Sequence, residues 1–139
     1  MCRNLIVSAI LCLTVVGCSS SEPRAAVHPA KGEVFCGGKP AAGAVVHLHP
    51  MQKDGQPPAY ATVEEDGTFQ LSTYRAKDGA AAGDYIVTIV WRDEYAVEDE
   101  RDKLVGPDKL GDRYSRVEAS PLRATIRAGK NELPRWEVE

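Results

Sequence analysis

The sequence lacks an apolar run long enough to cross a bilayer as a helix, and it has few aromatic residues. A spanning helix needs about 20 consecutive apolar residues, whereas the longest apolar stretch here runs from Leu5 to Val16. With two Trp, five Tyr and two Phe among 139 residues, the core has to consist mainly of aliphatic side chains. A chain of this length with 43% hydrophobic residues is enough for one domain of ordinary size.

Positive charge is not concentrated in any stretch of the chain. The chain carries 17 basic and 20 acidic residues, a formal net charge of −3. A nucleic-acid-binding segment usually combines clustered Lys and Arg with interleaved aromatic residues. We therefore predict no nucleic-acid partner.

The first 17 residues have the pattern of a secretion signal. Arg3 supplies a positive charge, the apolar stretch follows, and the small residue Gly17 precedes Cys18. The tetrapeptide VVGC that ends at Cys18 resembles the lipobox of bacterial lipoproteins, in which the signal peptide is removed before the cysteine and the cysteine is acylated. We predict that residues 1–17 are a lipoprotein signal peptide and that Cys18 carries the lipid.

Acyl chains on Cys18 would insert into a membrane, so we predict membrane lipid as a partner of this protein. Each buried methylene contributes about 0.8 kcal/mol, so the two or three acyl chains of a lipoprotein, such as palmitate, hold a protein almost permanently. The lipoprotein resemblance also favours the outer membrane, because Ser19 stands where an Asp would signal inner-membrane retention. We expect a cell-envelope protein that faces the periplasm or the exterior. The alternative is an ordinary secreted protein that is cut elsewhere.

One cysteine remains after this processing. Cys2 and Cys12 leave with the signal peptide and Cys18 is acylated, so Cys36 has no partner for an internal disulfide. A catalytic Cys36 would need a His and an orienting group. Its place in the strand-and-turn sequence GEVFCGGKP favours a packed or half-exposed thiol instead.

The rest of the chain divides into a tether and one domain. Residues 18–30 comprise the lipidated cysteine and SSSEPRAAVHPA, which is small, polar and without an apolar period, as in a flexible tether. From residue 31, short apolar segments alternate with Gly- and Pro-containing turns. The predicted strands are KGEVFC, AVVHLHP, AYATV, TFQLSTY, DYIVTIVW, LRATIRAG and NELPRWEVE. They predict an all-β fold, an antiparallel seven-stranded β-sandwich over residues 31–139.

Alternation along these segments predicts which side chains face the core. In AVVHLHP, Ala44, Val46 and Leu48 share one face, whereas His47 and His49 share the other. The segment DYIVTIVW is nearly apolar on both faces, so we expect it to lie centrally in its sheet.

Turn residues predict two hairpins and one long connection. Asp66-Gly67 offers the positive φ that a tight hairpin needs, and Gly129-Lys130-Asn131 is expected to join the last two strands as a hairpin. The connection from Arg92 to Pro121, a long loop over residues 92–121, is polar and irregular, and AVEDERDKL within it could form a helical turn. Connections usually take about 4–6 residues, so we expect function to reside here. The alternative, to which we give equal weight, is that this connection covers the edge of a sheet.

Four segments resemble, in order, those of a known family. They are GEVFCGGKPAAGAVVHLHP, EEDGTFQLSTY, DGAAAGDYIVTIVW and SPLRATIRAGKNELPRWEV. They resemble small bacterial lipoproteins with a carboxypeptidase-regulatory-like domain of the transthyretin-like (prealbumin-like) sandwich type, over residues 31–139. The shared motifs are turn glycines and core positions, which identify a fold better than an activity. The resemblance implies an accessory or adhesion-type module, because the C-terminal PRWEVE does not supply the motif of the transthyretin-like hydrolases.

Two groups of side chains are candidates for metal binding. His47 and His49 could offer two ligands, and His28 in the tether a distant third. A zinc site needs three or four protein ligands, so we predict no metal and no cofactor. The acidic run RDEYAVEDERDK lacks the Asp-x-Asp-x-Asp-Gly order of a calcium loop, and a solvated loop or a salt-bridged helix is favoured. Its acidic residues are Asp93, Glu94, Glu98, Asp99, Glu100 and Asp102.

Together these patterns predict a lipid-anchored cell-envelope binding or structural module that is not an enzyme. The sequence contains no Gly-rich phosphate loop, G-x-S-x-G elbow or H-E-x-x-H pair, and no residue is assigned a catalytic role. An envelope protein or a polysaccharide is the expected partner. The alternatives are a carbohydrate-binding module, and an accessory subunit or weak hydrolase on a transthyretin-like scaffold. Sugar binding has little support, because the aromatic candidates are scattered and Trp91 is expected in the core; these candidates are Tyr60, Tyr74, Tyr95, Tyr114 and Trp136.

Overall fold

The computed structural model describes residues 23–52, 55–95 and 104–139. None of these residues forms a helix that could span a membrane. The strands are β1 (Val27–His28), β2 (Ala30–Cys36), β3 (Lys39–Pro40), β4 (Val45–Pro50), β5 (Ala59–Thr62), β6 (Thr68–Gln70), β7 (Ala80–Ala81), β8 (Gly83–Val90), β9 (Arg92–Tyr95), β10 (Leu104–Asp108), β11 (Arg123–Ile126) and β12 (Asn131–Val138).

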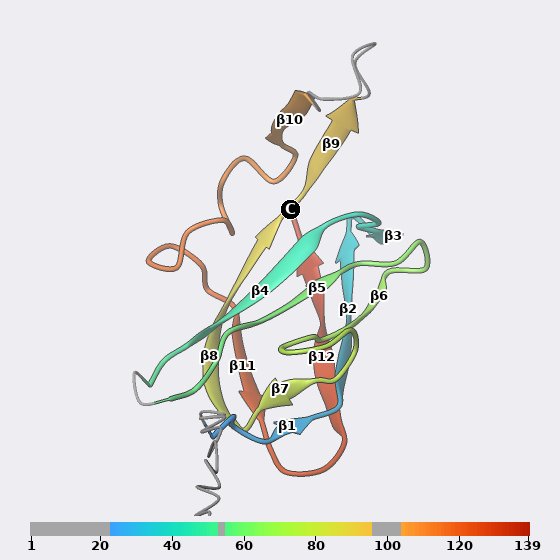
Figure 1. Cartoon of the computed structure of the whole chain (residues 1–139). Coiled ribbons are helices and arrows are strands. Elements are labelled where there is room, and N and C mark those ends of the chain that lie inside the picture. The colour runs from blue at the N-terminus through green and yellow to red at the C-terminus, as the bar shows by residue number, and fades with distance from the viewer. Residues whose placement is uncertain (1–22, 53–54, 96–103) are drawn as a thin grey trace, which may run out of the picture.

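Two sheets pack face to face and form a sandwich (Figure 1). One sheet has the strand order β11-β8-β4-β5, and the other has the order β12-β2-β3 with β6 also paired to β2. The short pair β1–β7 lies at one end of the sandwich, and the β9–β10 hairpin projects from the opposite end (Figure 1). The predicted all-β sandwich is confirmed. As expected, β8 lies centrally, between β11 and β4.

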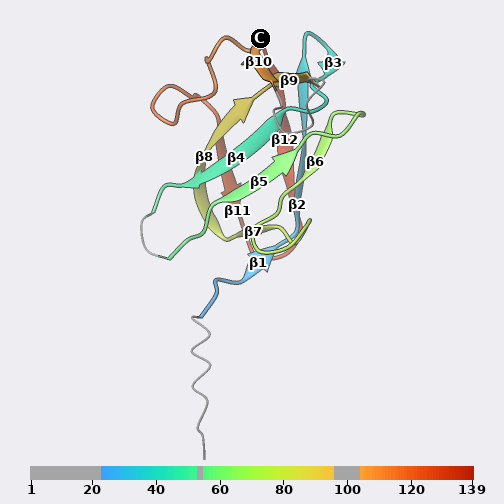
Figure 2. The same cartoon turned by 45° about the horizontal axis from the view of Figure 1, so that its top comes forward.

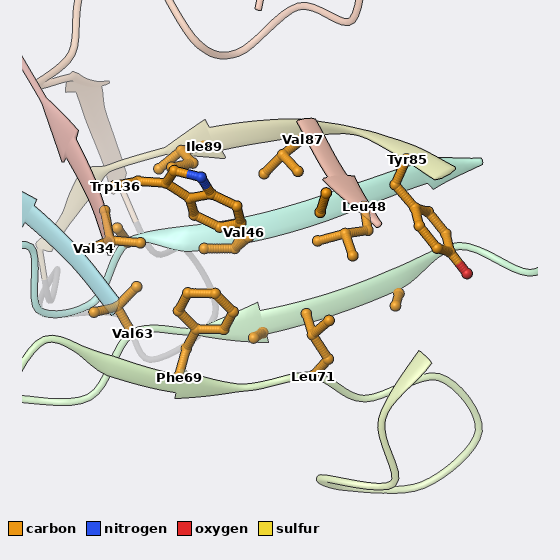
Figure 3. Packing of buried hydrophobic residues seen from close by; sticks show 14 of the residues in the cluster. Val34, Val46, Leu48, Val63, Phe69, Leu71, Tyr85, Val87, Ile89 and Trp136 are labelled. Atoms are coloured by element: carbon orange, nitrogen blue, oxygen red, sulfur yellow. The ribbon is translucent and has the colours of Figure 1, made fainter. Parts of the chain in front are cut away.

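The core lies between the inner faces of the two sheets (Figure 3). Strands β4 and β8 turn alternate side chains inward, as the sequence alternation predicted, and β2, β6 and β12 supply the opposite side. Phe69 and Trp136 stack in the middle, with ring centroids 5.6 Å apart and an interplanar angle of 13°. The largest fully buried side chains are Tyr85, Phe69, Leu48, Leu71, Ile89, Ile126, Val34, Val46, Val87 and Val138.

Gly32 allows the Phe69 ring to lie against the backbone of β2. These two residues are cross-strand neighbours. A Cβ at position 32 would lie 2.6 Å from Cζ of Phe69 and 3.2 Å from Cβ of Leu133, closer than packed atoms approach. A side chain here would therefore displace the aromatic ring at the centre of the core.

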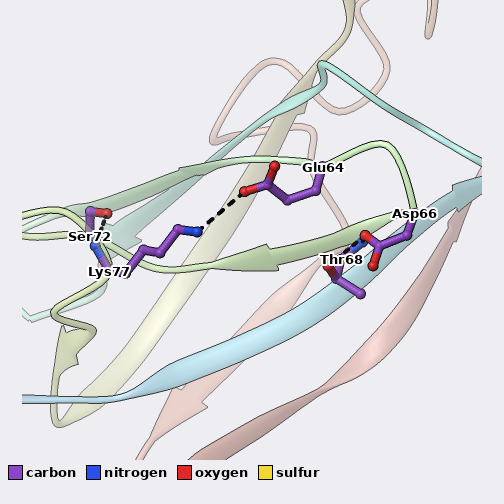
Figure 4. A network of polar contacts seen from close by, with 5 residues as sticks. All are labelled: Glu64, Asp66, Thr68, Ser72 and Lys77. Carbon is purple, nitrogen blue, oxygen red and sulfur yellow. Dashed lines mark hydrogen bonds and ion pairs between the residues drawn. The ribbon is translucent and has the colours of Figure 1, made fainter.

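The tight turn predicted at Asp66-Gly67 is present (Figure 4), but β5 and β6 do not pair as the two strands of a hairpin, because β5 pairs with β4 and β6 pairs with β2 in the other sheet. Gly67 has a φ of 87° and donates its N–H to the carbonyl of Glu64 over 3.0 Å. The carboxylate of Asp66 accepts hydrogen bonds from the backbone N–H of Thr68 at 3.0 Å and from its hydroxyl at 2.6 Å. The side chain of Asp66 thus stabilises the turn. The turn leads the chain from β5 in one sheet to β6 in the other.

The final hairpin was predicted wrongly. β11 pairs antiparallel with β8, whereas β12 pairs parallel with β2 in the other sheet, so residues 127–130 connect the two layers. The reason is burial: Trp136 and Val138 reach the core only from the edge of β2, whose register with β12 shifts between Glu132 and Arg135. All the other strand pairs in the described residues are antiparallel.

The folded domain begins four residues before the predicted boundary at Lys31. Val27 and His28 pair with Ala81 and Ala80, and Ala30 is buried. The carbonyl of Ala30 also accepts the N–H of Leu71 at 2.9 Å. Residues 27–30, which were assigned to the tether, are therefore held by the sandwich.

Phe69→Ala should lower the free energy of unfolding by about 3–5 kcal/mol, because it removes a fully buried ring and leaves a cavity beside Trp136. Denaturant unfolding of a chain that starts at Ser19 measures this loss. The matched control is Tyr60→Ala, which removes an exposed aromatic ring and should change stability by at most about 0.5 kcal/mol. Equal losses in the two variants would contradict the assignment of Phe69 as a central core residue.

Candidate functional site

Two regions singled out in the sequence, the paired histidines and the long connection, meet on one face of the sandwich. This face, called the groove face below, is the outer side of β4, β5 and β8 together with the base of the β9–β10 hairpin. His47 lies between Tyr60 of β5 and Thr88 of β8, and Val45 lies beside Val90. Because β4 alternates, these side chains point away from the core that Val46 and Leu48 enter.

The two imidazoles on the groove face lie in different environments. Their ring centroids are 6.1 Å apart at an interplanar angle of 32°. His47 is exposed, whereas the Nε2 atom of the half-buried His49 lies 2.8 Å from the hydroxyl oxygen of Thr88. Loss of solvation lowers the pKa of His49, and the neighbouring His47 lowers it further. A neutral His49 hydrogen-bonded to Thr88 is thus the favoured state of this pair.

A groove of about 290 Å³ opens where the hairpin meets the sheet. The backbone of Gly43 forms one side, and Arg92 and His47 supply polar atoms. Val45 and Val90 are half-buried in its floor, and Val105 on β10 is 58% exposed. The site therefore combines an apolar floor with a polar rim, which is the usual composition of a ligand groove.

Asp108 fixes the base of the hairpin. One of its carboxylate oxygens accepts the N–H groups of Trp91, at 3.0 Å, and Leu110, at 3.1 Å. The other is buried and has no hydrogen-bond partner in the part of the chain that the structure describes. Lys109 lies over the Trp91 ring, 4.5 Å from its centroid, and pairs with Asp93 at 2.6 Å. These contacts hold β9 and β10 in a defined position above the groove.

The second half of the long connection covers a sheet edge. β11 pairs with β8 only over residues 83–86, and beyond it the N–H of Ile89 donates to the carbonyl of Tyr114 at 3.0 Å. The hydroxyl of Ser120 donates to the carbonyl of Val87, and Leu110 and Tyr114 are buried in the core cluster. The edge-covering alternative is therefore correct for residues 109–122. The first half instead forms the hairpin, which lines the groove.

Other sequence candidates fall outside this face or outside the described residues. Cys36 is half-buried at the end of β2, and Nδ1 of His28 accepts the N–H of Gly129 at 3.4 Å. No three His, Cys, Asp or Glu side chains among residues 23–52, 55–95 and 104–139 lie close enough to hold a metal ion. Cys18 and residues 96–103, with most of the acidic run and the expected helical turn, lie outside the described chain.

Comparisons with known proteins do not identify a family. No family model matches the chain, and no curated protein matches it. Among solved structures, a 9R-lipoxygenase from Cyanothece PCC8801 is 11% identical with a TM-score of 0.43 over 97% of this chain. A DUF3823 family protein from Parabacteroides merdae ATCC 43184 is 16% identical with a TM-score of 0.42 over 82% of this chain. The chain spans 18% of the first structure and 46% of the second.

Acidification should destabilise the domain through His49. Because folding lowers the pKa of His49, the unfolded chain binds more protons as the pH falls through about 6.5. The stability that neutral His49 contributes is present above this pH and is lost below it. His49→Gln should flatten the dependence of unfolding free energy on pH between about 7.5 and about 5.5. An unchanged slope in His49→Gln would contradict this assignment.

Proposed function

We propose that this protein is a lipid-anchored module of the cell envelope that binds a partner through the groove face and has no catalytic activity of its own. The observation that carries this proposal is the groove of Val45, Val90 and Val105 beneath the hairpin. An apolar floor left open to solvent, with a polar rim, is characteristic of a binding site.

The anchor in this proposal is Cys18. The apolar stretch, the small residue before the cysteine and the polar segment after it support acylation. The sandwich supports the coarser part of the family resemblance, and we propose membership of the carboxypeptidase-regulatory-like, transthyretin-like lipoproteins as the finer part. We also propose the outer membrane as the location, because Ser19 follows the cysteine.

A protein segment is the partner that best suits the groove. Three valines accept branched apolar side chains, and Arg92 and His47 can bind backbone carbonyls or a carboxylate at the rim. A polysaccharide is the second candidate, because Tyr60 is 52% exposed beside His47 and presents a ring on which a sugar could stack.

The same geometry argues against catalysis on this face. The nearest approach to a nucleophile and base is the contact between Thr88 and His49. Thr88 is 2% exposed, so a substrate cannot reach its hydroxyl without displacing the side chains around it. A binding role needs no such access.

Cys18→Ser should leave the full chain uncut and unlabelled when cells are fed a fatty-acid probe, because serine offers no thiol for the thioether. The matched control is Cys36→Ser, which also removes one thiol and should be processed and labelled normally. Normal processing and labelling of Cys18→Ser would refute the anchor.

A photoreactive phenylalanine analogue placed at Val105 or Tyr60 should crosslink a partner in intact cells, because both side chains are exposed on the groove face. The matched control is the same analogue at Lys39, an exposed position of β3 in the other sheet. A crosslinked product whose mass is unchanged by glycosidases identifies a protein partner, and one whose mass falls toward that of the uncrosslinked protein after glycosidase treatment identifies a polysaccharide. Equal crosslinking from all three positions would refute the groove face as the binding surface.

A further inference from the structure

Separate segments of the chain that carry basic residues meet at the end of the sandwich where the described chain begins, beside β1 and β7 (Figure 2). The segments 23–32, 73–84 and 125–132 meet there, because β1 pairs with β7 and the first residues of β2 pair with the first residues of β12. They contain six exposed basic side chains and three acidic ones. The basic residues, called the basic end below, are Arg24, Lys31, Arg75, Lys77, Arg127 and Lys130.

Three of these lysines surround one hollow. Lys31, Lys77 and Lys130 line a depression of about 330 Å³ whose walls include Pro29 and Asn131. Lys31 pairs with Glu132 at 3.2 Å, and Lys77 reaches Glu64 at 3.5 Å (Figure 4). Both pairs are exposed, and exposed ion pairs are held weakly, so the ammonium groups can turn toward another anion.

The other acidic groups at this end are engaged within the fold. The carboxylate of Asp78 accepts three backbone N–H groups, from Thr73 at 2.7 Å, Tyr74 at 3.0 Å and Arg75 at 2.9 Å. Asp84 accepts the hydroxyl of Thr125 at 2.7 Å. These carboxylates point at the protein, whereas the basic side chains point into solvent.

Among the described residues, the opposite end of the sandwich has no such excess of cations. Glu65 and Asp66 are exposed in the turn between β5 and β6, and the carboxylates of Glu137 and Glu139 pair with Arg135 at 3.1 Å and Arg113 at 3.7 Å. The chain as a whole has more acidic than basic residues, 20 against 17. The excess of positive charge at the basic end is therefore a local feature of the fold.

Tyr74 and Arg24 lie at the same end of the sandwich as the three lysines. Tyr74 is 38% exposed, and the guanidinium of Arg24 lies 5.3 Å from the centroid of its ring. Tyrosine and arginine together are favoured at the boundary between water and lipid headgroups. Val27 follows Cys18 by nine residues, which span at most about 32 Å.

We propose that the basic end binds anionic phospholipid headgroups and so orients the sandwich on the membrane, with the β9–β10 hairpin directed away from it. The orientation rests on the proposed acylation of Cys18, but the headgroup contact does not. Each lysine near an anionic surface contributes enough to change the partition coefficient by about 5-fold at low salt. The six basic groups outnumber the three acidic groups at this end, so its net interaction with an anionic surface is attractive.

The test uses a chain of residues 19–139, which lacks Cys18 and keeps every residue of the core cluster. Its cosedimentation with phosphatidylcholine vesicles should rise when phosphatidylglycerol is included. The Lys77→Gln/Lys130→Gln variant should partition about 25-fold more weakly into the anionic vesicles. The matched variant Lys39→Gln/Arg116→Gln, which removes two exposed cations away from the basic end, should bind like the parent. Thermal unfolding checks that both variants are folded.

Three results would overturn the proposal. One is equal binding to neutral and anionic vesicles, or to neither. Another is the same loss in both double variants, which would mean diffuse attraction by net charge. The third is displacement by inorganic phosphate but not by sodium chloride of equal ionic strength, which would indicate a phosphate pocket. Because residues 19–139 carry no acyl chain, each result is independent of whether full-length Cys18 is labelled.

Discussion

The strand β8 is apolar on both faces, and most of the fold can be understood as the means of covering it. Tyr85, Val87 and Ile89 face the core, while Ile86 and Val90 lie half-buried on the outer face. Its two neighbours differ in length, because β4 pairs along most of β8 and β11 stops at residue 86. The backbone beyond that point would be an open edge, which favours aggregation. Residues 109–122 cover this edge, so the long connection is first of all a structural requirement of β8.

Local patterns predicted the strands better than their partners. Alternation placed Val46, Leu48 and Tyr85 in the core, and Asp66-Gly67 marked a tight turn, because each feature depends on neighbours in sequence. The parallel pairing of β12 with β2 depends instead on Trp136 meeting Phe69 of β6 over the β2 strand that lies between them in the same sheet. Those residues are far apart in sequence, and no periodicity encodes their contact. β1 was missed because two residues are too few to show a period.

Sequence patterns likewise predicted only the part of the candidate site that depends on neighbours in sequence. His47 and His49 were placed on the outer face from their spacing, and the importance of the connection came from its length. The sequence did not mark Val105 as a site residue, because a single valine near charged residues does not indicate a strand. Its place in the groove depends on the hydrogen bonds of Asp108 that fix the position of the hairpin. Clustered charge was likewise invisible: Lys31, Lys77 and Lys130 are distant in sequence and meet only because the strand ends converge.

The pairing of β1 with β7 also changes what a lipid anchor could do. Had the tether run freely to residue 30, its reach would have been longer by about 13 Å, at about 3.3 Å for each of four extended residues. Because Val27 and His28 are held against Ala80 and Ala81, the predicted tether extends no further than the basic end itself. Electrostatic attraction between exposed charges fades over a Debye length of about 8 Å at physiological salt. A tether that leaves from the basic end allows its cations to come within that range of the headgroups, whereas the same tether leaving from the opposite end would bring the carboxylates of the β5–β6 turn nearer to them.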